Sequence, residues 1–213
     1  NHLYDLRSQD PATIHAEIAT CEKRLVALTA QPCRGFRAPG YNLSPDIAHA
    51  LSQRGYAYDS SVLPCPPYYL AKAAVMGALR LIGKPSRSQM TLPGHLLAPR
   101  HPYRMSPASP FAPGAGPLWE IPIAVSRCLR LPVIGTTLPM YGLPALDRAY
   151  DGIFNLEFHA IDLVDDGDNL PPALVSRQHD LRTHVDTKRH AYRAAFARLR
   201  RSHRFRTLGD AVG

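Results

Sequence analysis

The sequence GFRAPGYNLSPDIAHALSQRGYAYDSS, residues 35–61, contains the alternation that sets the fold class. Residues 35–39 predict a short strand that ends at a proline. Residues 44–54 predict a helix, because a Ser-Pro pair starts the segment and a glycine follows it. Residues 56–61, after the glycine that ends the helix, then predict a second strand.

The preceding residues extend this alternation by one helix. Asp10-Pro11 is a typical helix start, because the aspartate caps the first turn and the proline fits its first position. Apolar residues then recur at steps of three and four up to residue 30 (Ile14, Ile18, Cys21, Leu25 and Leu28). Residues 10–61 therefore predict helix, strand, helix and strand, which implies parallel strands in an α/β layer or barrel.

The rest of the chain is predicted to complete a single domain over residues 1–213. The other predicted elements are a helix at 68–82, strands at 118–125, 153–159 and 205–208, and a helix at 185–203. Residues 64–117 interrupt the alternation as an insertion that combines the helix at 68–82 with a Pro-rich loop at 86–117. With 213 residues and 45% hydrophobic side chains, such a domain can bury a core.

Composition excludes several classes of protein. No run approaches the ~20 apolar residues of a membrane span, so we expect no transmembrane segment. The four cysteines are far apart and form no Cys-x-x-Cys pair, so we expect reduced thiols. Neither observation fixes the compartment, and a bacterial cytoplasm or cell envelope is our expectation.

The chain is basic, with 25 Lys and Arg against 17 Asp and Glu and a net charge of +8. Residues 177–206 hold ten of these cations and two acids. We interpret them as the solvated face of a helix. A nucleic-acid module is an alternative, but the segment lacks interleaved aromatic residues and any zinc-finger or helix-turn-helix pattern.

Three short motifs carry the candidate chemistry. They are NHLYD at residues 1–5, FRAPGY at residues 36–41 and LEFH at residues 156–159. Each motif by itself is common, and its arginine or histidine could be structural. Their order, with the helix and strand spacing between them, is much more specific, because α/β enzymes place their sites at strand ends.

This order resembles the polysaccharide deacetylase superfamily of NodB-like carbohydrate esterases. His2 matches the first histidine of that family's His-x-x-x-His motif, and Arg37-Ala38-Pro39 matches its Arg-x-Pro motif. Tyr58-Asp59-Ser60-Ser61 and Leu156-Glu157-Phe158-His159 match its two later motifs. The resemblance implies a distorted (β/α) barrel, here without its first strands.

The resemblance also implies a metal-dependent hydrolase that deacetylates sugars. In the family a divalent cation, usually zinc, activates water and polarises the acetyl carbonyl. His159 would be the general acid, and Asp59 would orient it. Arg37 would hold a catalytic aspartate, the amide of Gly40 would bind the oxyanion, and Tyr41 would lie beside the substrate.

Two departures from the family concern the metal site. The chain starts after the position of the family's aspartate pair, so we expect an N-terminally incomplete chain with little activity by itself. Leu6 stands where the family has its second histidine. Asp5 is the nearby substitute, because three-residue spacing on a helical turn faces the same side as His2. The predicted metal ligands are therefore His2 and Asp5.

Two functions remain open beside the nucleic-acid alternative. The first is an enzyme that removes acetyl groups from an N- or O-acetylated oligosaccharide or polysaccharide, which the Arg37 and His159 motifs favour. The second is an impaired deacetylase-like protein that binds carbohydrate, which Leu6 favours. The zinc content of a longer form of the chain would distinguish these two functions.

Overall fold

The computed structural model describes residues 3–84, 86, 88–141 and 153–212 of the chain. These residues form two compact units. Unit 1 contains the described residues of Asn1–Ile123 and Thr207–Gly213, and unit 2 is Ala124–Arg206. Each unit is described by itself, and the single domain over 1–213 stays a prediction.

The predicted helix and strand alternation is confirmed at the start of unit 1. Helix α1 (Pro11–Thr29) is followed by β1 (Gly35–Phe36), α2 (Pro45–Gln53) and β2 (Tyr58–Asp59). Both predicted helix caps form. The Asp10 side chain accepts a hydrogen bond from Thr13 N at 3.0 Å, and Ser44 Oγ accepts one from Ile47 N at 3.2 Å.

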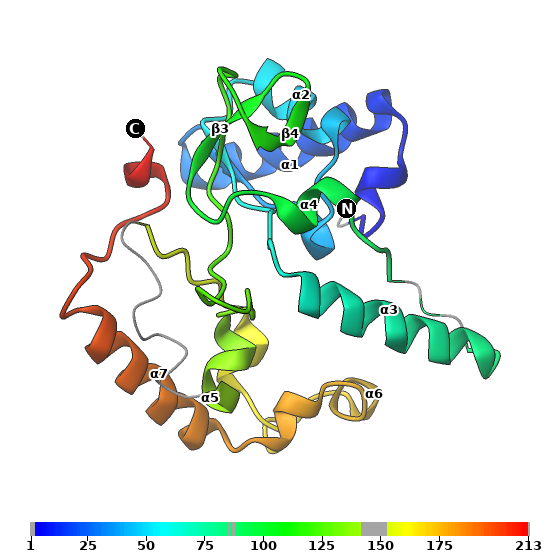
Figure 1. Cartoon of the computed structure of the whole chain (residues 1–213), viewed down its shortest axis with the longest axis vertical. Helices are drawn as coiled ribbons and strands as arrows, with labels where there is room; N and C mark the ends of the chain where they lie inside the picture. Colours follow the sequence, from blue (N-terminus) through cyan, green and yellow to red (C-terminus); the bar gives the residue numbers. More distant parts are fainter. Residues whose placement is uncertain (1–2, 85, 87, 142–152, 213) are drawn as a thin grey trace. The chain divides into compact units, whose positions relative to one another are not determined.

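Five strands form one mixed sheet in the order β1-β2-β5-β3-β4. Strands β1, β2 and β5 (Trp119–Glu120) are parallel, with Gly35 opposite Tyr58 and Asp59 opposite Glu120. Strands β3 (Tyr103–Ser106) and β4 (Ser109–Pro113) continue the sheet in antiparallel pairing. The α/β class is therefore confirmed, and the sheet of the described residues is open, so it shows no barrel (Figure 1).

The predicted loop at 86–117 is wrong. After α3 (Pro66–Leu81), which confirms the helix predicted at 68–82, this segment contains α4 (Pro93–Leu97) and the β3–β4 hairpin. The prolines that indicated a loop include Pro110 and Pro113, and both lie in β4. A proline is tolerated there because β4 is an edge strand, which needs no donor on its free side.

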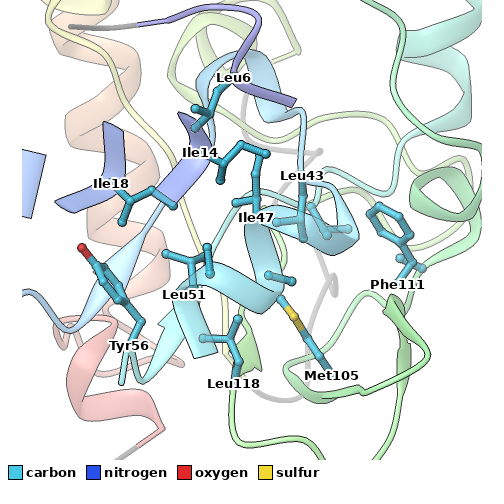
Figure 2. Packing of buried hydrophobic residues seen from close by; sticks show 14 of the residues in the cluster. Leu6, Ile14, Ile18, Leu43, Ile47, Leu51, Tyr56, Met105, Phe111 and Leu118 are labelled. Carbon is cyan, nitrogen blue, oxygen red and sulfur yellow. The ribbon is translucent and has the colours of Figure 1, made fainter. Parts of the chain in front are cut away.

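The core of unit 1 joins α1 and α2 to the strands and the hairpin (Figure 2). Its buried side chains include Leu6, Ile14, Ile18, Leu43, Ile47, Leu51, Tyr56, Met105, Phe111 and Leu118. Only the first half of the apolar stripe that predicted α1 is buried. Ile14 and Ile18 are buried, whereas Cys21, Leu25 and Leu28 are exposed because the second half of α1 extends beyond this core.

Unit 2 is built on α7 (Val185–Leu199), which confirms the helix predicted at 185–203. Its core contains Ala124, Val133, Leu138, Tyr192, Ala195 and Leu199. The other elements of the described chain are α5 (Leu138–Tyr141), α6 (Pro172–Val175) and the short 3-10 helices η1 (Leu6–Ser8), η2 (Pro39–Tyr41), η3 (Gly135–Thr137), η5 (Ala160–Leu163), η6 (His179–Arg182) and η7 (Gly209–Ala211).

The remaining strand predictions need correction. The strand predicted at 118–125 is only Trp119–Glu120, and neither 153–159 nor 205–208 is a strand. Residues 153–158 are extended, but they accept isolated backbone bonds, from Ala124 N to Asn155 O at 2.9 Å and from Gly135 N to Glu157 O at 2.8 Å. These two hydrogen bonds do not form a continuous ladder, so the segment is not a strand of a sheet.

The sequence predicted no transmembrane segment, and the helices of the structure bear on this prediction. None of those in the described ranges has the length and hydropathy needed to span a bilayer.

Candidate functional site

Arg37 leaves the carboxyl end of β1 and is held by the turn after β2. Its Nε donates to Ser60 O at 2.7 Å, and its Nη2 donates to Ser60 Oγ at 2.7 Å. The next residue of the motif is held as well, because Ala38 N donates to Ser61 Oγ at 2.7 Å. These bonds clamp two loops that parallel pairing places at one edge of the sheet.

A pair of buried acids lies directly beneath this clamp. Asp59 on β2 and Glu120 on β5 are register partners, and both side chains are fully buried. Asp59 accepts hydrogen bonds from Ser61 N at 2.9 Å and Ser61 Oγ at 2.8 Å. Glu120 accepts one from Val62 N at 3.0 Å. The acids therefore support the turn to which Arg37 bonds.

The pKa values of both carboxyl groups are raised. Burial raises the pKa of Glu120 well above its ordinary value, and the neighbouring Asp59 charge raises it further. Burial also raises the pKa of Asp59, and its bonds to Glu120 and Ser61 oppose that effect. As an anion, Glu120 would leave Oε2 without a partner among the described residues; as an acid, it donates to Asp59. Glu120 is thus the protonated member.

The turn after Arg37 has an unusual backbone. Gly40 and Tyr41 both have left-handed conformations, with φ of 60° and 62°. A side chain at Gly40 would meet the ring of Tyr4 at 3.0 Å, so the segment that precedes η1 packs against this turn. The structure therefore brings the Arg37 motif and the residues around Asp5 together in unit 1.

The predicted metal ligands are only partly described. His2 lies outside the described residues. Asp5 is exposed, and its Oδ2 accepts a hydrogen bond from Gln9 Nε2 at 3.1 Å. The described ranges contain no cluster of three or more His, Cys, Asp or Glu side chains that could hold a metal. The side chain of Leu6 points into the core of unit 1 (Figure 2). A histidine at this position would therefore not face a metal bound by Asp5.

His159 lies in unit 2, at the start of η5, and it is paired with a buried carboxylate. Its Nε2 is 3.1 Å from Glu157 Oε1. The His159 side chain is 59% exposed, whereas the Glu157 side chain is 1% exposed. A buried acid therefore holds an accessible imidazole, which is the arrangement that orients a general acid or base.

The backbone around His159 is fixed by Asp162. One carboxylate oxygen of Asp162 accepts His159 N at 2.8 Å, and the other accepts Thr136 Oγ1 at 2.8 Å. The hydroxyl of Tyr192 on α7 donates to Asp162 O at 3.1 Å. The turn that presents the imidazole is thus tied to the core of unit 2.

Sequence reasoning missed Glu157 and Glu120. Glu157 precedes His159 by two residues in an extended segment, where alternate side chains face the same side, and that spacing is the signal that could have found it. Glu120 is the acid within an otherwise apolar predicted strand. His95, which lies in the segment predicted as a loop at 86–117, is fully buried.

The predicted site residues divide between the units. Arg37, Gly40, Tyr41 and Asp59 belong to unit 1, and His159 belongs to unit 2. Comparison of the chain with protein-family models, with curated proteins and with solved structures finds no match. The functional argument therefore depends on the residues themselves.

Proposed function

We propose that this protein is a hydrolase that removes acetyl groups from N- or O-acetylated sugars of a polysaccharide or glycan. The observation that carries the proposal is the pairing of the accessible His159 with the buried Glu157. A histidine that a carboxylate orients can protonate the departing amine or alcohol when an acetyl group is cleaved. The distorted (β/α) barrel of the resembled family belongs to the same proposal.

The Arg37 loop would serve the acyl group. The guanidinium, already fixed by two bonds to Ser60, would hold a catalytic carboxylate in place by charge-assisted hydrogen bonds. The amide of Gly40 would donate to the oxyanion that develops on the acetyl oxygen, and Tyr41 would flank the sugar. The left-handed backbone of Tyr41 supports this, because a strained non-glycine residue of this kind is common at ligand sites.

Asp59 has two proposed roles that experiment can separate. The sequence predicts that it orients His159. Its bonds to Ser61 and Glu120 favour a positioning role beneath the Arg37 loop. Glu157 is then the carboxylate that orients His159.

A divalent cation, zinc by resemblance, is part of the proposal as the source of an activated water. His2 and Asp5 are its proposed ligands in this chain. The described residues alone do not fit a metal centre, because Asp5 is bonded to Gln9 and no ligand cluster surrounds it. We therefore assign the steps above only to side chains and amides of the chain.

The alternative is a carbohydrate-binding protein that has lost the deacetylase reaction. The burial of Leu6 in the core favours it, since this position contributes no ligand. In that case Arg37 and Tyr41 would contact the sugar without chemistry, and added zinc would change nothing.

The test uses the protein expressed from its complete reading frame, whatever precedes or follows these residues. Acetate release from N-acetylated and O-acetylated oligosaccharides is measured with and without added zinc. We expect His159→Ala and Glu157→Gln to lower kcat by about 10²–10⁴-fold with little change in KM, as loss of acid–base catalysis does.

His101→Ala is the matched control, because this exposed histidine lies outside both motifs and should change binding at most. Wild-type turnover in His159→Ala across pH 6 to 9 would refute the proposal. Tight sugar binding without acetate release would support the binding protein instead.

A further inference from the structure

Helix α3 has an apolar surface that its own unit does not cover. Of its 16 residues, Tyr69 is the buried one. Leu70, Val75 and Leu81 on the helix, and Ile82 directly after it, are exposed to 72%, 59%, 89% and 66%. Beyond its first turn, the helix extends away from the sheet of unit 1 (Figure 1). Exposed apolar patches of this kind mark interaction surfaces.

The first turn of α3 is anchored in unit 1. The ring of Tyr69 packs edge-on against His95 of α4, with centroids 5.4 Å apart, and its hydroxyl lies 3.2 Å from His95 Nε2. Tyr68 packs on the ring of Tyr69 with centroids 5.0 Å apart. This anchor fixes where α3 begins and leaves the rest of its surface for another partner.

The two most exposed leucines of α3 and its two cations occupy different sides. Leu70, Ala74 and Leu81 follow one another at helical spacing, with Gly77 and Ala78 between the last two, so they share one face. Lys72 and Arg80 are eight positions apart with Met76 midway, and this row lies on the other side. The helix is therefore amphipathic, with cations opposite its most exposed leucines.

The chemistry of the surrounding sequence identifies the partner. Residues 60–119 contain no Asp or Glu, and the cations within the helix or shortly after it are Lys72, Arg80 and Lys84. An apolar face bordered by cations without any acid is complementary to anionic lipid headgroups over an acyl layer. An apolar surface that packs against another protein would not require the absence of acidic residues.

The length of α3 decides how it would meet a bilayer. At a rise of about 1.5 Å per residue, 16 residues are too short for the ~20 that cross the hydrocarbon layer. We propose that α3 lies in the plane of an anionic phospholipid surface, with Leu70, Leu81 and Ile82 among the acyl chains and the cations at the headgroups.

Vesicle co-sedimentation of the whole chain tests this proposal without any activity measurement. The probes are vesicles of phosphatidylglycerol with phosphatidylcholine, and vesicles of phosphatidylcholine alone. We expect binding to the anionic vesicles only, weakening as salt rises. Leu81→Glu and the pair Lys72→Gln with Arg80→Gln should each weaken it by about tenfold or more.

Leu97→Glu is the matched control, because this leucine of α4 is 79% exposed in the same unit but lies outside α3. Its binding should stay within about twofold of wild type, the effect of one added charge at a distance. Absence of binding to anionic vesicles, or equal losses in Leu97→Glu and Leu81→Glu, would overturn the proposal.

Sedimentation velocity of the chain without lipid tests whether a second copy of the chain, and not a membrane, covers α3. A dimer that Leu81→Glu dissociates, in a protein that ignores vesicles, would show that a second copy covers α3 and would also overturn the proposal. Near-wild-type circular dichroism of each variant ensures that the losses do not come from unfolding.

Discussion

Mild acid is predicted to destabilise unit 1 through His95. This side chain is fully buried, and its Nε2 accepts a hydrogen bond from Leu63 N at 2.8 Å. The pKa of His95 is lowered from 6.5 to about 3, mainly by burial and in part by the nearby charge of Lys72. The folded protein therefore keeps the imidazole neutral at a pH where the unfolded chain takes up a proton.

The sign and size of the effect follow from this difference in pKa. The contribution of His95 to stability is complete above pH 6.5 and is lost as the pH falls toward 3. Each pH unit inside this window costs about 1.4 kcal/mol. Lowering the pH to 5 should therefore reduce the contribution of His95 to the free energy of unfolding by roughly 2 kcal/mol.

Urea unfolding followed by fluorescence measures this loss, because Trp119 is the one tryptophan and lies on β5 of the same unit. The comparison is with His95→Gln, whose amide oxygen can accept the bond from Leu63 N and does not titrate. The variant is less stable near neutral pH, and its disadvantage should shrink by roughly 2 kcal/mol between pH 7.5 and 5. Parallel stability curves would refute the reasoning, as would an equal effect in His101→Gln, which changes an exposed histidine.

The other structural predictions concern burial and close packing. Because Glu120 keeps a proton that the unfolded chain loses above about pH 4.5, the contribution of Glu120 to stability should fall as the pH rises above that value, so the stability of Glu120→Gln relative to wild type should rise with pH in the same urea titration. Leu6→His puts an imidazole into the core and should lower the free energy of unfolding by about 2–5 kcal/mol, which thermal unfolding checks; unchanged stability would mean that position 6 faces outward. Gly135→Ala places a Cβ against Asp162 and Phe158 and should lower both the melting temperature and the turnover that depends on His159, whereas Gly55→Ala, which has open space around it, tests backbone strain alone.

Local signals predicted the elements that local chemistry determines. The Asp10 and Ser44 caps fixed the starts of α1 and α2, because each side chain satisfies an amide of the first turn. Alternation of helices and strands indicated the parallel pairing of β1 and β2 correctly. The barrel of the resembled family could not be tested from these patterns, and the described strands make an open sheet.

The failures arise where distant residues decide. In the sequence Pro110 and Pro113 indicate a loop. In the structure both lie in β4, which can contain prolines because it is at the edge of the sheet. The stripe of α1 continues to Leu28, but nothing in periodicity says where the core beneath it ends. The pairing of Asp59 with Glu120 joins residues far apart in the chain, so only the register of β2 and β5 reveals it.

In the candidate site, too, the sequence predicted some residues and only the structure revealed others. Arg37 and His159 were found as motif residues, while their partners were found only in three dimensions. Ser60 holds Arg37 through bonds that cross from β1 to β2, and Glu157 holds His159 from beneath. The motif thus locates the reactive side chain, and tertiary packing supplies the groups that orient it.

Mass spectrometry of an acetylated oligosaccharide after incubation with the protein, expressed from its complete reading frame, tests the deacetylase proposal most directly. The account predicts products that have lost acetyl groups one at a time, with the sugar chain at its original length and with free acetate in equal amount. It also predicts that His159→Ala, at the same concentration, leaves the oligosaccharide intact. An unchanged mass with the wild-type protein, or shortened sugar chains that keep their acetyl groups, would contradict it.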